Sequence, residues 1–232
     1  MAKLVSIVVP VLNEVENLGD LAQKAHGDRS KIEYIVVDGG SDDGSLDAAR
    51  VWADKVVSCQ RGRALQMNVG AGLASGEFLL FLHADTRLPD ELHSFLFALA
   101  SAQPTWGFFR VRLRPTNLLL QLVATLMNWR SRVTSVATGD QAIFVRRELF
   151  EYMGGFDDIP LMEDVAFSKK LRRLCGPLQW QQKVTVSSRR WRNHGVLRTI
   201  LLMWLLRLQY VLGVSPSVLH KRYYGRSCDH DR

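Results

Sequence analysis

The chain has few cysteines and lacks the glycine pattern of a dinucleotide-binding strand. Its 232 residues include only Cys59, Cys175 and Cys228, an odd and scattered set without a CxxC pair. Neither a zinc site nor a disulfide framework is indicated, so we expect a reducing, cytoplasmic environment. No GxGxxG follows a predicted strand, which argues against a dinucleotide oxidoreductase.

The most apolar segment, residues 196–214, lacks a long uncharged run. Arg198 and Arg207 interrupt it and leave only eight residues between them, against the roughly 20 that a membrane span needs. At about 100° per residue, the two arginines lie on opposite faces of a helix. The sequence therefore predicts an amphipathic C-terminal extension, residues 196–232. It packs on the body or on a second copy of the chain, or it touches a lipid surface.

The positive charge is placed unevenly. The formal net charge is +7, and residues 189–232 alone carry eight arginines, one lysine and two aspartates, so the first 188 residues sum to zero. A neutral body with a basic end indicates an anionic ligand, an anionic membrane surface or simply a solvated basic surface there.

Apolar runs bounded by turn residues predict a βαβαβαβ first half. Strands are expected at 4–12, 32–37, 56–58 and 78–82, with helices near 18–25, 45–53 and 64–74 between them. The N-terminal segment MAKLVSIVVP is predicted to be the first strand and not a signal peptide, because it lacks the long apolar core and the cleavage site of a signal peptide. This order of elements predicts a doubly wound α/β sheet with right-handed crossovers.

The pattern changes after Pro89. Helices are expected at 92–99, 117–132 and 163–174, and strands at 109–113, 141–145 and 183–188. In the first of these strands Arg110, Arg112 and Arg114 alternate with apolar residues, which predicts a half-exposed strand with a basic outer face. We therefore expect a mixed sheet in one domain, residues 1–195, followed by the extension.

Polar side chains follow the ends of the first four predicted strands. They are Asn13 and Glu14, then Asp38, then Arg61 and Arg63, then His83 and Asp85. In open α/β sheets, ligands bind outside the carboxyl ends of the strands. Taken singly, Asp38 is equally explained by an Asx turn and Asp85 by a helix cap. Four consecutive strand ends of this kind favour a binding site.

His83 and Asp85 flank Ala84 and are expected on the same side of their strand, because side chains alternate along a strand. A carboxylate and an imidazole at a strand end suit a divalent metal that carries a diphosphate. The pair therefore predicts a magnesium or manganese site.

Six motifs together resemble the family 2 glycosyltransferases of GT-A fold, over about residues 5–194. In order they are PVLNE, VVDGGSDDGS, GRALQMNVGA, LHADT, GDQAIFVRRELFEYMGGFD and LMEDVAFSKKLRR. More narrowly, LHADTRLP, PLMEDVAFSKKLRR and SSRRWRNHG resemble the radical-SAM/selenodomain-associated transferases, some of which are assigned to arsenosugar biosynthesis. The resemblance implies a GT-A fold with a Rossmann-like nucleotide-binding half.

The resemblance also implies an activity. That activity is an inverting, hexosyltransferase-type transfer from a UDP- or GDP-sugar to a hydroxyl acceptor of unknown identity, with magnesium or manganese on the diphosphate. Asp164 would be the base, and Glu163 would orient it or contact the acceptor. The donor would be held by Pro10, Asn13, Glu14, Asp38, Asp42, Arg63, Ala84, Asp85, Arg189 and Arg190.

Asp85 would be a metal ligand. His83 and His194 are candidates for further metal ligands. His83 replaces the first carboxylate of the family's D-x-D pattern, and imidazole suits manganese better than magnesium. The arginines at 189, 190 and 192 would clamp the leaving diphosphate.

Two other functional classes fit the sequence less well. A nucleotidyltransferase is expected to carry a glycine-rich basic loop after the first strand, and PVLNEVENL has neither feature. A non-catalytic nucleotide-binding protein is expected to have lost Asp85 or Asp164, and both are present. No nucleic-acid partner is expected. The protein is expected in the cytoplasm, where its extension would form a homodimer or contact the inner face of the membrane.

Overall fold

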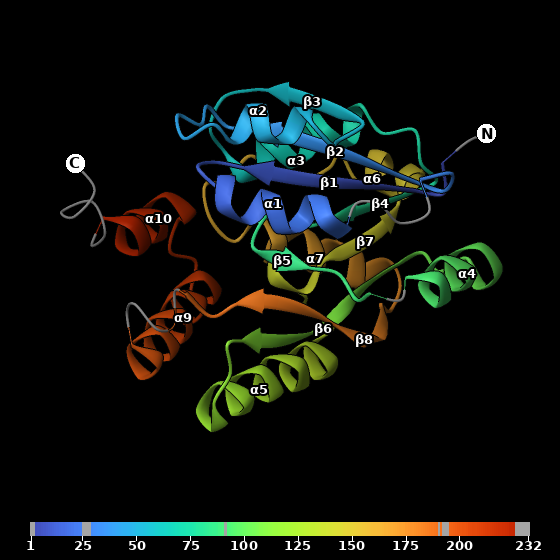
Figure 1. Cartoon of the computed structure of the whole chain (residues 1–232). Helices are drawn as coiled ribbons and strands as arrows, with labels where there is room; N and C mark the ends of the chain where they lie inside the picture. The colour runs from blue at the N-terminus through green and yellow to red at the C-terminus, as the bar shows by residue number, and fades with distance from the viewer. Residues whose placement is uncertain (1–2, 25–28, 91, 190, 192–194, 226–232) are drawn as a thin grey trace.

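A computed structural model describes residues 3–24, 29–90, 92–189, 191 and 195–225 of the chain (Figure 1). The first half contains β1 (Val5–Val11), α1 (Val15–Lys24), β2 (Ile32–Asp38), α2 (Ser45–Arg50), β3 (Lys55–Ser58), α3 (Arg63–Gly72), β4 (Phe78–Phe81), β5 (Thr86–Arg87) and α4 (His93–Ala102). The second half contains β6 (Trp106–Arg114), α5 (Leu118–Thr134), the 3-10 helix η1 (Gly139–Gln141), β7 (Ile143–Arg146), α6 (Arg147–Tyr152), α7 (Glu163–Leu174), β8 (Leu178–Ser187), α9 (Val196–Val211) and α10 (Pro216–Tyr224).

One eight-stranded mixed sheet runs through the molecule in the order β3-β2-β1-β4-β7-β6-β8-β5. The strands β3, β2, β1 and β4 are parallel, as the sequence predicts. β7 is antiparallel to both β4 and β6, and β6 is parallel to β8. It follows that β6 and β8 run in the same direction as β1. The strands β1, β2, β3, β4, β6 and β8 therefore have their carboxyl ends at one edge of the sheet, and β7 runs the other way.

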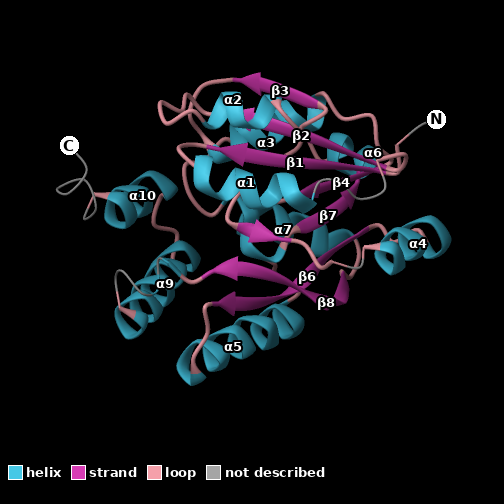
Figure 2. Cartoon of the chain, viewed as in Figure 1, coloured by secondary structure: helices cyan, strands magenta, loops and turns pink. Residues whose placement is uncertain are grey.

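Helices cover both faces of the sheet, because the central strands are apolar on both sides (Figure 2). In β4, Phe78 and Leu80 join one core cluster with residues of α1, α4 and α5. Leu79 and Phe81 join the opposite cluster with residues of α3, α6 and α7. The two-residue period of the strand thus divides a single apolar run between two cores.

Helix α3 lies very close to the sheet, and a glycine makes this possible. A Cβ atom on Gly70 would lie 2.4 Å from a methyl carbon of Val8. The small residues of GRALQMNVGA therefore allow the backbone of α3 to approach β1 and β2.

The structure differs from the predicted elements at several boundaries. β4 ends at Phe81, and Ala84 and Asp85 lie in a turn in which the Thr86 amide donates to the His83 carbonyl at 3.0 Å. The expectation that His83 and Asp85 alternate along a strand was therefore wrong. Helix α2 ends at Arg50 rather than near residue 53. Four elements were not predicted, namely β5, η1, α6 and α10.

The C-terminal segment forms two helices that pack against the start of α7. Leu206 of α9 and Leu219 of α10 are buried in a third cluster with Leu161, Met162 and Val165. Within the described part of the chain, no helix is both long enough and apolar enough to cross a membrane.

Candidate active site

The loops that follow β1 and β2 are tied together by side-chain hydrogen bonds. The Asn13 amide donates to the Ser41 hydroxyl at 2.9 Å, and the Asp42 amide donates to Asn13 Oδ1 at 3.0 Å. Asn13 adopts a left-handed conformation with φ 55°, which asparagine tolerates better than most residues. The structure thus brings Asn13 and Asp42 together at the end of β1, the strand in which Pro10 pairs with Val37 of β2.

Asp38 lies beneath these loops and holds a turn. Its side chain is buried, with 2% exposure for the residue. Its Oδ2 accepts hydrogen bonds from the amides of Gly40 at 2.9 Å and Ser41 at 3.0 Å, and its Oδ1 accepts one from the Ser41 hydroxyl. Asp38 therefore forms the Asx turn that the sequence offered as an alternative to ligand binding.

Gln66 of α3 is a residue that the sequence analysis missed. Its buried side-chain amide donates to the carbonyl of Val11 at 2.8 Å and to that of Val37 at 2.9 Å. One glutamine therefore fixes the ends of β1 and β2 relative to each other. A polar residue on the buried face of a small-residue helix was the signal available in the sequence.

Acidic and imidazole groups gather at the end of β4. His83 Nδ1 lies 3.4 Å from Asp140 Oδ1. Burial raises the pKa of Asp85, the nearby Asp140 raises it further, and His83 and Arg63 act in the opposite direction. Burial also raises the pKa of Glu14, and the charge of Asp85 adds to this rise. The crowding of carboxylates leaves excess negative charge at this point.

The side chains at the end of β4 carry donor atoms of the kinds that a divalent cation binds. Asp85 and Asp140 have carboxylate oxygens and His83 has a nitrogen, a combination that suits manganese better than magnesium. In the ranges that the structure describes, no three His, Cys, Asp or Glu side chains form a ready-made metal cage, so phosphate oxygens would have to complete the coordination. His194 lies outside the described residues. Ala84 is buried in the turn between His83 and Asp85.

Asp140 was not among the predicted site residues. It lies in η1, just before β7, and reaches Asp85 and His83 because β7 pairs with β4. The segment GDQAIF is part of one of the family motifs, but the sequence does not show which side chains Asp140 contacts, because strand pairing brings together segments that are distant in the chain.

A second acidic pair opens α7. Asp164 Oδ2 accepts a hydrogen bond from the Gly139 amide at 2.7 Å. Glu163 is 2% exposed, and its Oε1 lies 3.6 Å from Arg63 Nη1. Burial raises the pKa of Glu163, and the adjacent Asp164 adds to the effect, whereas Arg63 opposes it. Arg63 thus pairs with Glu163 and lies near Asp85, so one arginine connects both acidic groups.

Gly139 joins the two acidic groups through the backbone. Its amide binds Asp164, and a Cβ atom on Gly139 would lie 2.3 Å from the His83 ring. Arg130 of α5, also missed by the sequence analysis, lies near both Asp164 and Asp140. Burial lowers the pKa of Arg130, and the charges of these two carboxylates act in the opposite direction.

Arg189 is the part of the predicted arginine clamp that the structure describes. Its guanidinium lies 4.0 Å from Glu14 Oε2 and 3.9 Å from Glu16 Oε2. It therefore faces the end of β1, on the side where the acidic groups gather. Arg190 and Arg192 lie outside the described residues.

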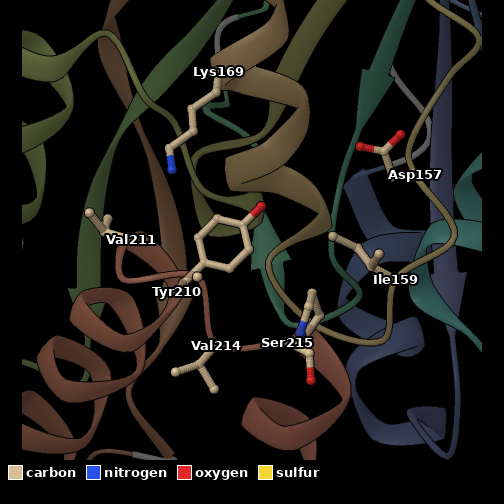
Figure 3. Close-up of a pocket in the computed structure, with 9 residues that line it drawn as sticks. Asp157, Ile159, Lys169, Tyr210, Val211, Val214 and Ser215 are labelled. Carbon is tan, nitrogen blue, oxygen red and sulfur yellow. The ribbon is translucent and has the colours of Figure 1, made fainter.

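A cavity of about 460 Å³ lies between α7 and the C-terminal helices (Figure 3). The Lys169 Nζ lies 4.7 Å from the centroid of the Tyr210 ring, and the phenol oxygen points toward the helix that carries Lys169 (Figure 3). Burial raises the pKa of Tyr210, and the charges of Asp157 and Asp164 contribute. Asp164 does not line the cavity, but its charge acts on Tyr210, which does.

Comparisons with known sequences point to one family. Residues 6–149 match the family described as Glycosyl transferase family 2. A glycosyltransferase of Mycobacterium tuberculosis is 28% identical over an alignment of 192 positions that covers 76% of this chain and 72% of that protein. The PGL/p-HBAD biosynthesis glycosyltransferase of Mycobacterium bovis is 36% identical over an alignment of 98 positions that covers 38% of this chain and 37% of that protein.

Solved structures of such proteins share the fold. S. aureus TarS 1-349 in complex with UDP-GlcNAc has a TM-score of 0.65 at 18% identity, over 80% of this chain and 59% of that one. The mannosyltransferase PcManGT from Pyrobaculum calidifontis, in complex with GDP-Man and Mn²⁺, has a TM-score of 0.60 at 21% identity, over 97% of this chain and 70% of that one. This chain therefore spans less than two thirds of the TarS chain. With more than half of its length matched and this architecture shared, the chain belongs to glycosyl transferase family 2, has the GT-A fold and is a glycosyltransferase.

Proposed function

We propose that the protein transfers a sugar from a nucleotide-sugar donor to an acceptor hydroxyl with inversion, in a reaction that depends on a divalent metal. The observation that carries this proposal is the position of Gly139. Its amide binds Asp164 and its α-carbon lies against the ring of His83, so Gly139 lies between Asp164 and the side chains of His83, Asp85 and Asp140. The neighbouring structures that contain UDP-GlcNAc, or GDP-Man and Mn²⁺, support a nucleotide-sugar donor and a metal. The family match leaves the nucleotidyltransferase and the non-catalytic alternatives without support.

The donor would lie across the carboxyl ends of β1, β2 and β4. Asn13 and Asp42 would contact the nucleoside, and Asp38 would support them by holding its turn. Asp85, Asp140 and His83 would hold the cation, which when bound would neutralise charge on the leaving diphosphate. Arg189 would contact the diphosphate, because its guanidinium faces this side of the cluster.

Asp164 would take the proton. The acceptor oxygen attacks the anomeric carbon as the bond from that carbon to the diphosphate oxygen breaks, and the hydroxyl proton passes to Asp164. The Gly139 amide fixes the orientation of this carboxylate. The acceptor would approach through the cavity beside Tyr210.

Glu163 is better suited to a positioning role. Its carboxyl is buried against Arg63, so an acceptor hydroxyl does not reach it without displacing that pair. We propose that Glu163 holds Arg63 between the two acidic groups.

The division of the chain follows from this proposal. Residues 1–195 would form the catalytic domain, and α9 with α10 would close the acceptor side of it. The narrower resemblance to transferases of arsenosugar biosynthesis stays a prediction, as do the sugar and the acceptor.

Titration calorimetry with a panel of nucleoside diphosphates and nucleotide sugars, each with and without Mn²⁺, tests the proposal. We expect tight binding of one base only in the presence of Mn²⁺, and loss of that binding in Asp85→Asn. Binding of equal affinity in the presence of a chelator would contradict metal dependence, and binding of no nucleotide sugar would contradict the donor class.

A further inference from the structure

Helix α5 leaves an apolar stripe in solvent. Leu118, Leu122, Leu126, Trp129 and Val133 recur every three or four residues and are all exposed, Leu118 to 84% and Trp129 to 63%. At helical spacing these positions share one face. The opposite face of α5, which includes Leu120 and Val123, packs on the core.

Helix α9 repeats this arrangement. Leu197, Leu201, Trp204, Leu208 and Val211 recur every three or four residues and are exposed, Leu201 to 70% and Trp204 to 69%. Thr199 and Leu206 are buried on the other side of the helix. Each helix thus exposes a stripe of leucines and valine with a single tryptophan.

The two stripes begin at the same end of the sheet. In the parallel pair of β6 and β8, Arg114 is the register partner of Ser187. Helix α5 begins at Leu118, four residues after Arg114, and α9 begins at Val196, nine residues after Ser187. Figure 1 shows α9 beside the tips of these strands and α5 running back from them along the sheet. The carboxyl end of β1 lies at this same edge, so both stripes begin near the edge that carries the candidate active site, whereas Trp129, toward the far end of the α5 stripe, lies near Pro177 and Gln179 at the start of β8.

The segments around both stripes carry one sign of charge. From Arg110 to Gly139 the sequence has five arginines and no acidic residue, and all of these arginines except Arg130 lie away from the acidic groups of the site. From Val196 to Tyr224 it has Arg198, Arg207, Lys221 and Arg222 and again no acidic residue. A second copy of the chain would bring these like charges together across a two-fold interface, which is unfavourable.

We propose that α5 and α9 together form a docking surface for the headgroup region of an anionic lipid bilayer. Leucine and tryptophan side chains enter the interface, where tryptophan is favoured, while arginines contact acidic headgroups. Both helices lie on the surface and do not span it, consistent with their length and hydropathy. This assignment needs no assumption about the sugar-transfer reaction.

Flotation of the full-length protein with lipid vesicles tests the proposal. We expect binding to vesicles that contain phosphatidylglycerol, and weak binding to pure phosphatidylcholine. High salt should weaken the binding, because the electrostatic contribution is screened. Two variants separate the helices, Leu122→Ser with Trp129→Ser on α5 and Leu201→Ser with Trp204→Ser on α9. Each should lower the partition coefficient by about tenfold or more, because two apolar side chains no longer enter the bilayer.

Phe97→Ser is the matched control, because Phe97 is a 68% exposed apolar residue of α4 outside both stripes. It should bind vesicles like the unmodified protein. All the substituted side chains are exposed, and thermal unfolding should confirm that each variant keeps its folded state. Equal vesicle binding by all variants would overturn the proposal. A lipid-free dimer that dissociates in the α5 and α9 variants would also overturn it and assign the stripes to a second copy.

Discussion

The carboxylate of Asp164 accepts a hydrogen bond from a backbone amide, and this contact lets a substitution of Asp164 separate catalysis from folding. In Asp164→Asn the amide oxygen can still accept the 2.7 Å hydrogen bond from Gly139, so the fold and the donor site should persist. If Asp164 is the base, the rate of transfer should fall by about 10² to 10⁴. Single-turnover transfer and donor calorimetry measure the two effects separately.

Asp47→Asn serves as the control for this change. Asp47 is an exposed aspartate whose contact is with Arg50 of the same helix, and its replacement should leave transfer unaltered. A near-normal rate for Asp164→Asn would remove that residue from the role of base.

Glu33 is a buried carboxylate at the opposite end of the sheet from the site. Its Oε1 accepts hydrogen bonds from the Ser6 hydroxyl, from the Ser75 amide at 2.6 Å and from the Ser75 hydroxyl at 2.9 Å, and Lys55 Nζ lies 3.2 Å from Oε2. Burial acts to raise the pKa of Glu33, but these partners outweigh it and the pKa is lowered. The ionised form therefore stabilises the fold.

We expect Glu33→Gln to lower the free energy of unfolding at pH 7 by about 1–3 kcal/mol, since it weakens a buried network. A lowered folded-state pKa gives stability that is present above the unfolded value, about 4.3, and is lost as pH falls through the folded value. Urea unfolding at neutral pH and near pH 3 should show the difference between the two proteins shrink. A difference independent of pH would mean that packing, not charge, explains the effect.

At the scale of elements, prediction succeeded where local signals determine the structure. Helix α7 runs from Glu163 to Leu174 as predicted, because acidic residues follow Pro160 and apolar residues then recur at helical spacing. Strand β8 begins at Leu178, five residues before the predicted start, because Gln181 and Gln182 interrupt the alternation of apolar and polar residues and the segment before them is ordered by pairing with β6. Asp140 and Arg130 were missed for the same reason, since only tertiary pairing brings them to Asp85 and Asp164.

The contact between α3 and β1 gives a prediction for one helix. Gly70→Ala places a methyl group 2.4 Å from Val8, so it should destabilise the protein by about 1–3 kcal/mol despite the better helix propensity of alanine. Gly72→Ala in the same helix meets nothing within 4 Å and should be neutral or stabilising by up to about 1 kcal/mol. Chemical denaturation compares them, and equal effects would refute the close-approach argument.

At the scale of the whole molecule, the succession of elements was enough to predict a parallel half followed by a mixed half. The full strand order was not predictable, because it depends on which distant strands pair after β4. The two-helix form of the extension was also missed, since α10 has a weak apolar pattern and is held by Leu219 in the cluster beside α7.

Ligand binding should stabilise the entire fold if the proposed donor site is correct. A nucleotide at 100 times its dissociation constant adds about 2.7 kcal/mol to the free energy of unfolding. We therefore expect the melting temperature to rise when Mn²⁺ and the preferred nucleoside diphosphate are added together, and to return to its ligand-free value with a chelator. A nucleotide-induced rise that survives chelation would contradict metal-dependent binding.

The glycine at position 139 has a consequence for engineering. Its amide fixes Asp164 and its α-carbon abuts the His83 ring, so main chain rather than side chains sets the gap between the two acidic groups. If the proposed metal and acceptor sites are correct, residues at either end can be exchanged without altering that gap: His83→Asp would change which cation is preferred, and substitutions around Tyr210 would change which acceptor is admitted. An inserted residue next to Gly139 would instead misalign both ends at once, so variation in metal and acceptor choice is compatible with one fixed spacing.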